Sequence, residues 1–118
     1  MKAMISQPMR GKTDQEIVET RNKAASYLKT LGYDIIQTVF DLDEDWLRFT
    51  GCKQIPVRYL GESLNAMSLC DAVYFCDGWE KARGCLIEHE VASLYGLVCI
   101  YEREDRGFLR WLRRKRHA

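Results

Sequence analysis

Several features that mark large classes of protein are missing from this sequence of 118 residues. No apolar run approaches the length of a membrane span. The first residues, MKAMISQPMR, lack the long apolar region and the small-residue cleavage site of a signal peptide. No internal repeat is visible. These absences argue against a membrane-spanning, secreted or repeat protein, and we expect a soluble protein of the cytoplasm.

Paired cysteine motifs are missing as well. The chain has five cysteines, an odd number, and no two of them have the CxxC spacing. Structural zinc sites are usually built from such pairs, and disulfide frameworks usually use an even number of cysteines. We therefore expect free thiols, mostly buried, and neither a metal site nor a cofactor.

The charge is nearly balanced over the whole chain, with a formal net charge of +1, but it is unevenly distributed. Residues 102–118 hold seven Lys or Arg against three Asp or Glu, which leaves 11 against 14 for the rest of the chain. Apolar residues are interspersed in this basic segment: Phe108, Leu109, Trp111 and Leu112. We expect a basic helix or tail that docks on the sheet or on a neighbouring subunit. Binding of nucleic acid or of an anionic membrane is the alternative.

The most informative stretch that is present covers residues 71–101. An apolar run at 72–76 predicts a strand buried on both faces, and residues 97–101 predict a second one. Between them, a helix is expected to open near Gly84 and to end at Gly96. Its apolar positions Ile87, Val91 and Leu94 predict the buried face, with Glu88 beside that stripe and His89 pointing outward. The polar loop at 77–83 then lies where open α/β sheets bind ligands.

The rest of the chain completes an α/β pattern. Residues 2–6 predict the first strand, and the TDQE sequence from Thr13 predicts a capping box that starts a helix ending near Leu31. A second strand is expected at 33–39, an irregular acidic segment at 40–58 and a helix at 59–69. We therefore predict a single domain over residues 1–118. Its fold class is a three-layer α/β/α arrangement with a four- to five-stranded, mainly parallel sheet, flavodoxin-like or Rossmann-like.

Two polar positions in this pattern have alternative interpretations. The loop at 7–12 places Arg10 and Lys12 beside a helix start, which favours an anion, but a tight turn with two solvated cations is equally compatible. The loop contains one glycine, Gly11, whereas a P-loop or a dinucleotide-binding fingerprint requires several, so the loop matches neither motif. Glu88 is either a reactive carboxylate at a strand-to-helix junction or a surface residue paired with Lys81 or Arg83.

Three segments together carry a resemblance to a known family: ISQPMRGKTDQE, SLNAMSLCDAVYF and DGWEKARGCLIEHEVASLYGL. Their order resembles the nucleoside 2-deoxyribosyltransferase-like superfamily. It is closest to the small bacterial and phage branch that is classed only as a domain of unknown function. The resemblance covers about residues 2–101 and implies the same α/β fold.

The resemblance also implies roles for particular residues. Glu88 matches the glutamate that acts as nucleophile in the characterised enzymes, and Asp77 matches an acid that orients or protonates the leaving base. The loop after the first strand would hold the sugar or a phosphate. The substrate-binding residues expected on this basis are Ser6, Gln7, Arg10, Gly11, Lys12, Gly84 and Trp79.

Two functions follow as hypotheses. The first is an N-glycosidase or deoxyribosyltransferase-like enzyme that acts on a nucleotide or nucleoside through Glu88. The second is a non-catalytic module that binds a nucleotide-derived ligand or a protein partner. The related enzymes imply a homodimer or a larger homo-oligomer.

Overall fold

The computed structural model describes residues 1–103, so the predicted basic tail lies outside the described residues apart from Glu102 and Arg103. Strands and helices alternate along most of this length. The elements are β1 (Lys2–Ser6), α1 (Asp14–Thr30), β2 (Asp34–Ile35), α2 (Glu44–Phe49), α3 (Ile55–Met67), β3 (Ala72–Phe75), the 3-10 helix η1 (Trp79–Lys81), α4 (Arg83–Leu94) and β4 (Val98–Tyr101).

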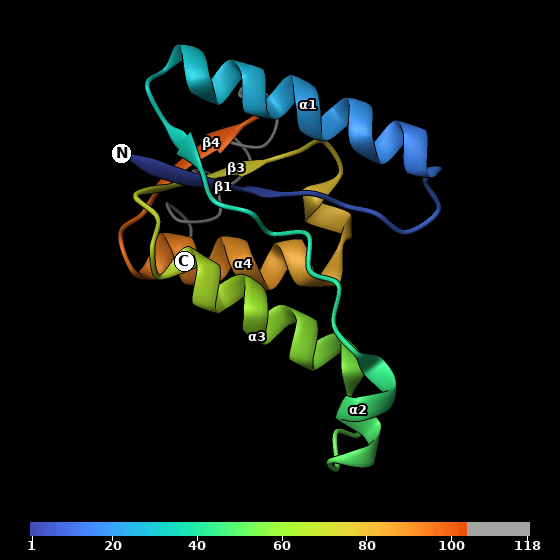
Figure 1. The fold of residues 1–118 in the computed structure, drawn as a ribbon. Coiled ribbons are helices and arrows are strands. Elements are labelled where there is room, and N and C mark those ends of the chain that lie inside the picture. The colour runs from blue at the N-terminus through green and yellow to red at the C-terminus, as the bar shows by residue number, and fades with distance from the viewer. Residues whose placement is uncertain (104–118) are drawn as a thin grey trace.

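The strands form one parallel sheet in the order β2-β1-β3-β4. α1 covers one face of this sheet, and α3 and α4 cover the other (Figure 1). The predicted three-layer, flavodoxin-like or Rossmann-like α/β fold is therefore confirmed, with four strands in the described part of the chain.

Two apolar cores lie on the two faces of the sheet because successive side chains of a strand point to opposite sides. The core facing α1 contains Ala3, Ile5, Ala24, Leu28, Tyr33, Ala72, Tyr74 and Cys76. The core facing α3 and α4 contains Met4, Met67, Val73, Phe75, Trp79, Cys85, Ala92 and Tyr101. Both faces of β1 and β3 are thus buried, which explains why these strands are almost continuously apolar.

The sheet has a switch point between β1 and β3. From β1 the chain proceeds through α1 to β2 on one side, and from β3 it proceeds through α4 to β4 on the other side. Ser6 is paired with Phe75, so the loops that follow these two strands leave the same edge of the sheet as neighbours. Such a point is where open α/β sheets bind ligands.

The second strand is shorter than predicted: only Asp34 and Ile35 pair with β1, instead of residues 33–39. Beyond them the Ile36 N–H still donates to the Ala3 carbonyl at 2.8 Å, but two residues later it is the Thr38 hydroxyl that donates to the Ile5 carbonyl, at 3.2 Å. The prediction of a longer strand was wrong because the hydrogen bond from the Thr38 side chain to β1 is a tertiary contact that the local sequence pattern does not reveal.

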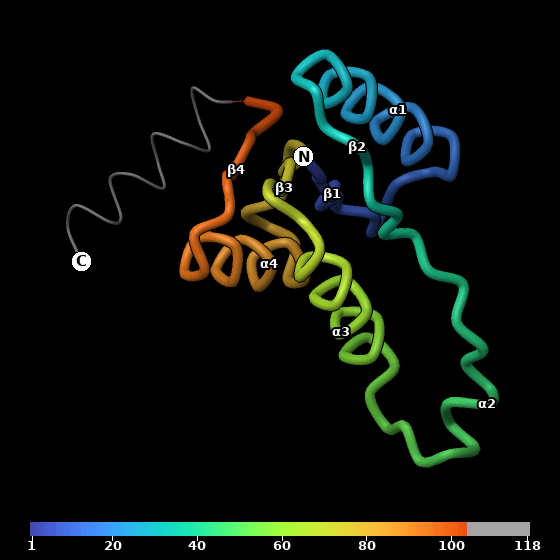
Figure 2. Tube along the Cα trace, turned by 60° about the vertical axis from the view of Figure 1, so that its left-hand side comes forward, coloured from blue at the N-terminus to red at the C-terminus, as the bar shows by residue number. Residues whose placement is uncertain are grey.

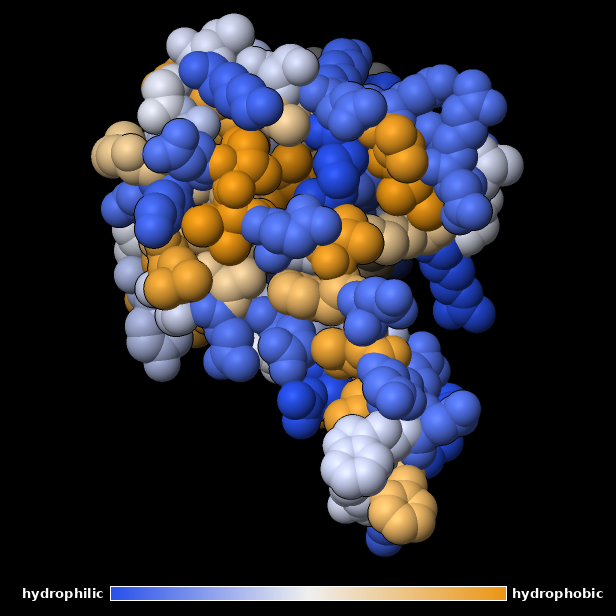
Figure 3. Space-filling view, in the orientation of Figure 1, coloured by the Kyte–Doolittle hydropathy of each residue, from blue (hydrophilic) through white to orange (hydrophobic). Residues whose placement is uncertain are grey.

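The segment at 40–58 contains more helix than predicted. Asp43 caps α2 by accepting from the Trp46 backbone N–H at 3.0 Å, so the acidic cluster starts a helix, and α3 begins at Ile55 rather than at 59. α2 projects away from the rest of the domain (Figures 2 and 3).

The buried face of α4 differs from the predicted one. The residues that are buried are Cys85, Glu88, His89 and Ala92, whereas Ile87 and Leu94 are 39% and 65% exposed. His89 was expected to point outward, but it is buried. Its ring stacks on Trp79 with centroids 4.2 Å apart, and its Nε2 lies 2.7 Å from the Tyr101 hydroxyl. The prediction failed because the imidazole of His89 finds both aromatic packing and a polar partner, the Tyr101 hydroxyl, inside the core. These contacts decide which face of α4 is buried, although the stripe of Ile87, Val91 and Leu94 is more apolar.

Candidate functional site

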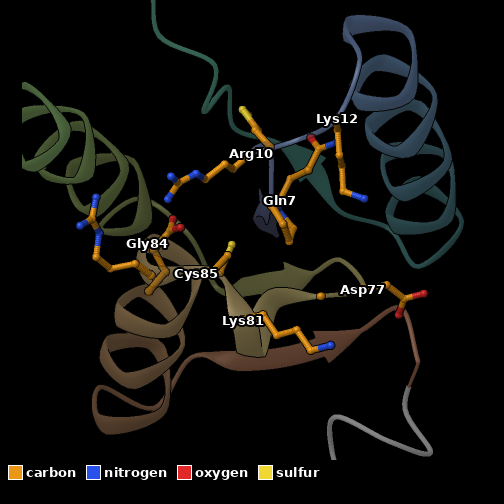
Figure 4. A pocket seen from close by; sticks show the side chains of 13 residues that line it. Gln7, Arg10, Lys12, Asp77, Lys81, Gly84 and Cys85 are labelled. Carbon is orange, nitrogen blue, oxygen red and sulfur yellow. The ribbon is translucent and has the colours of Figure 1, made fainter.

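A pocket of about 770 Å³ opens at the switch point of the sheet (Figure 4). Its walls come from three segments: the loop after β1, the loop after β3 and the first turns of α4. The lining residues include Gln7, Pro8, Met9, Arg10, Lys12, Asp77, Gly78, Lys81, Arg83, Gly84, Cys85 and Glu88. The volume is in the range of pockets that bind small molecules.

Glu88 places a buried carboxylate in this pocket. It is 8% exposed, and its Oε1 accepts a hydrogen bond from the fully buried Ser6 hydroxyl at 3.1 Å. Burial raises the pKa of Glu88 to about 7, and the Ser6 hydrogen bond partly opposes this shift. The carboxyl group is therefore present in both protonation states near neutral pH.

The raised pKa of Glu88 makes stability depend on pH. The folded state binds the proton more tightly than the unfolded state does, so this stabilisation is complete below about pH 4.5 and is lost as pH rises through about 7. The difference between these pKa values corresponds to roughly 3 kcal/mol. We therefore expect Glu88→Gln to unfold with a free energy about 2–3 kcal/mol higher than wild type at pH 8.5.

The measurement is urea unfolding of both proteins at pH 4.5 and pH 8.5. At pH 4.5 the two free energies of unfolding should agree within about 0.5 kcal/mol, because Glu88 is then protonated in the folded state and only about half ionised in the unfolded state. Other titrating groups are common to both proteins and cancel in the comparison. A difference that is the same at both pH values would contradict the buried, raised-pKa carboxyl.

Cations outnumber acids around the pocket. Arg10, Lys12, Lys81 and Arg83 line it, and none of the four forms an ion pair with a carboxylate among residues 1–103. Figure 4 shows Arg10 and Lys12 on the loop after β1 and Lys81 across the pocket from them. Unpaired cations around a concave site attract anionic ligands.

Asp77 belongs to the same pocket but lies on the side opposite Gly84, with its carboxylate pointing away from Gly84 (Figure 4). Arg103 Nε donates to Asp77 Oδ2 at 2.7 Å, and the Asp77 backbone N–H donates to Glu102 at 3.1 Å. Burial and the charge of Glu102 raise the pKa of Asp77, and Arg103 opposes them. The described structure shows no hydrogen bond between Asp77 and Glu88.

Comparison with protein families gives one match. Residues 1–101 match the family described as Domain of unknown function (DUF4406). The chain belongs to this family. Neither the curated proteins nor the solved structures gave a match. The matched range of the DUF4406 domain extends from β1 to the last residue of β4 and contains every residue that lines the pocket.

Some of the predicted site residues of the DUF4406 domain line the pocket and others do not. Those that line the pocket are Gln7, Arg10, Lys12, Asp77, Gly84 and Glu88. Ser6 does not line it, but its hydroxyl donates a hydrogen bond to the Glu88 carboxylate. Gly11 occupies a left-handed turn at a φ of 79°, and Gln7 donates its side-chain amide to the Ile17 carbonyl at 2.8 Å, which anchors the loop to α1.

Trp79 was expected to bind substrate, but it does not line the pocket. Its side chain is buried in the core that faces α3 and α4, where it contacts Phe75 and His89. A large aromatic residue in a loop beside a predicted site is ambiguous in sequence, and here core packing determines its position.

Cys85 is a pocket residue for which sequence reasoning offers no functional signal. Burial raises the pKa of the Cys85 thiol to about 11, so the sulfur stays protonated and forms part of the wall. Lys81 and Arg83 were expected only as surface partners of Glu88, although both belong to the loop predicted to carry the site.

Among residues 1–103, no group of three or more His, Cys, Asp or Glu side chains is placed to hold a metal ion. All five cysteines are free. No helix in the described part of the chain has the length and apolar character needed to cross a membrane.

Proposed function

We propose that this domain cleaves the N-glycosidic bond of a nucleotide or nucleoside, with Glu88 as nucleophile. The observation that supports it is the buried carboxylate of Glu88, held by Ser6 in a cation-lined pocket at the switch point. The likeness of the MRGKTDQE and GWEKARGCLIEHE segments to the nucleoside 2-deoxyribosyltransferase-like superfamily is consistent with this role.

The chemistry requires one nucleophile and one source of a proton. A Glu88 carboxylate oxygen attacks the anomeric carbon, forming a glycosyl ester while the bond from that carbon to the base nitrogen breaks. The electron pair leaves with the base, which takes up a proton. Water then attacks the ester, releasing the sugar and regenerating the carboxylate. Transfer to a second base instead of water would make the same site a deoxyribosyltransferase.

Asp77 is the candidate for orienting or protonating the leaving base. Its raised pKa suits a proton donor, whereas its ion pair with Arg103 holds the carboxylate away from Gly84. A proton-donor role requires Asp77 to leave Arg103 when substrate binds. This role is therefore secondary in the proposal, and solvent is the other source of the proton.

The ion pair between Asp77 and Arg103 favours a second candidate function, because it engages the carboxylate that would serve as proton donor. This candidate is a module that binds a nucleotide-derived ligand without turnover. The same cations would bind the ligand, and Glu88 would contribute only to its recognition. Assembly as a homodimer or larger homo-oligomer is part of both proposals, on the basis of the sequence resemblance.

The experiment that separates the two candidates is a base-release assay. Wild-type protein is incubated with ribo- and deoxyribonucleosides and their 5′-monophosphates, and free base is followed by chromatography, with Glu88→Ala in parallel. We expect release from at least one substrate by wild type and none by the variant. Binding of a nucleotide, seen as a thermal shift, without release from any substrate would favour the binding module.

A further inference from the structure

A second cavity of about 300 Å³ adjoins the pocket described above. It lies between the first turns of α3 and α4 and is lined by Gln54, Pro56, Val57, Leu60 and Ile87. Arg83 and Gly84 line both cavities. The two cavities are therefore neighbours on either side of the start of α4, and we call the smaller one the apolar annex.

The apolar annex and the larger pocket differ in chemistry. Four residues of the annex present aliphatic carbon, and among them Val57 is 62% exposed, so apolar surface is left in contact with water. The larger pocket instead carries four cations and two carboxylates, Glu88 and Asp77, of which Asp77 is paired with Arg103. A ligand that is anionic at one end and flat and apolar at the other would match both environments, since covering apolar surface and pairing cations are each favourable.

The spacing along α4 connects the two environments. Glu88 follows Gly84 by four residues, which is about one helical turn, or 5.4 Å along the axis. That rise is comparable to the width of a nucleobase. A sugar with its anomeric carbon at Glu88 can therefore place its base beyond Gly84, in the annex, because the glycine has no side chain to obstruct it.

We propose that the apolar annex binds the base of a nucleoside 5′-phosphate whose phosphate is bound by Arg10, Lys12 and Lys81. This inference rests on the proposed function for the position of the sugar. Leu60 and Ile87 contact one face of the base, and Arg83, which lines both cavities, stacks on it or donates to its edge. Gly84 is the position that determines whether a base is admitted.

Gly84 offers a direct test because it accepts a side chain. It lies in helical conformation, and a Cβ built there has no atom within 4 Å. Gly84→Leu should therefore leave the helix intact, because leucine has a higher helix propensity than glycine, while its side chain occupies space that the two cavities share. Gly61→Leu is the matched control, since Gly61 lies in α3, has equally open surroundings and lines neither cavity.

The measurement is calorimetric titration in a Glu88→Gln background, which keeps the nucleotide intact. The probes are deoxyadenosine 5′-monophosphate, deoxycytidine 5′-monophosphate and 2-deoxyribose 5-phosphate, which lacks a base. We expect at least one nucleotide to bind at least about tenfold more tightly than the sugar phosphate. Gly84→Leu should reduce this ratio to below about threefold and leave the sugar phosphate within about twofold, and Gly61→Leu should change neither.

The outcomes separate this inference from the proposed function. A base-dependent affinity that Gly84→Leu removes, in a protein that releases no base, would sustain the annex and contradict turnover. Base release by wild type that Gly84→Leu leaves unchanged would sustain turnover and overturn the annex. The annex would also be overturned if Gly84→Leu weakened the binding of nucleotide and of sugar phosphate equally, or if neither nucleotide bound.

Discussion

Glu88→Gln should lower the proposed rate of base release by a factor of about 10³ or more, because an amide oxygen cannot form the glycosyl ester that the proposed reaction requires. The substitution keeps the side-chain volume, and the amide oxygen can still accept from the Ser6 hydroxyl, which lies 3.1 Å from Glu88 Oε1. The expected loss is therefore chemical rather than structural. It is measured as kcat/KM for free-base release, with circular dichroism as a check on folding.

The same reaction should depend on pH in a defined direction. Since the pKa of Glu88 is raised to about 7, kcat/KM should rise about tenfold per pH unit below 7 and level off above it. Ser6→Ala removes the hydrogen bond that lowers this pKa, so the profile should move to higher pH.

Two controls make this prediction specific. Glu90→Gln changes an exposed carboxylate on the same helix that does not line the pocket, and it should leave the rate within about twofold. Retention of more than a tenth of the wild-type rate by Glu88→Gln would rule out Glu88 as the nucleophile. An activity that falls as pH rises from 5 to 7 would contradict the need for its carboxylate form.

Phe75→Ala lowers the free energy of unfolding by about 3–5 kcal/mol, the largest stability loss that we expect from a single side chain. Phe75 is completely buried at the end of β3, and its ring lies 4.9 Å from that of His89 and 5.5 Å from that of Trp79, measured between centroids. Alanine at this position would leave a cavity within the aromatic cluster of Phe75, Trp79, His89 and Tyr101, against which α4 packs. Since single domains are stable by about 5–15 kcal/mol, this is a large fraction of the total.

The matched control for this loss is Phe49→Ala. Phe49 lies on α2, is 83% exposed and stacks on the exposed Trp46, so its removal should change the free energy of unfolding by less than about 1 kcal/mol. Urea unfolding of the two variants and of wild type measures both values. Similar losses for Phe75→Ala and Phe49→Ala would contradict the position of the aromatic cluster in the core.

The two predictions are connected through α4, because Glu88 lies on this helix and Phe75, at the end of β3, packs against its His89. His89 anchors α4 in the aromatic cluster, and the preceding residue, Glu88, thereby enters the pocket. Burial of the ionised carboxylate destabilises the fold above pH 7, yet the proposed reaction uses that ionised form. A group that decreases stability in the state in which it acts is common at functional sites, because activity and stability select different residues there.

Much of the fold could be predicted because its signals are local. The apolar runs of β1 and β3 are typical of strands buried on both faces, and the TDQE sequence forms the predicted capping box, with Thr13 accepting from the Glu16 backbone N–H at 3.1 Å. The candidate site could be located for the same reason, since loops that follow parallel strands meet at one edge of the sheet. The burial and pKa of Glu88 had no such local signal.

The sequence by itself determined the order of the strands and helices in the α/β pattern and the edge at which polar loops gather. Only the tertiary structure decided which face of α4 is buried, because two stripes with helical spacing compete on it. The stripe from Ile87 to Leu94 is more apolar, but the one from Cys85 to Ala92 meets the aromatic cluster and Ser6. Contacts between residues distant in the chain thus direct the Glu88 side chain into the pocket and the Trp79 side chain into the core. Residue spacing along α4 does not encode such contacts.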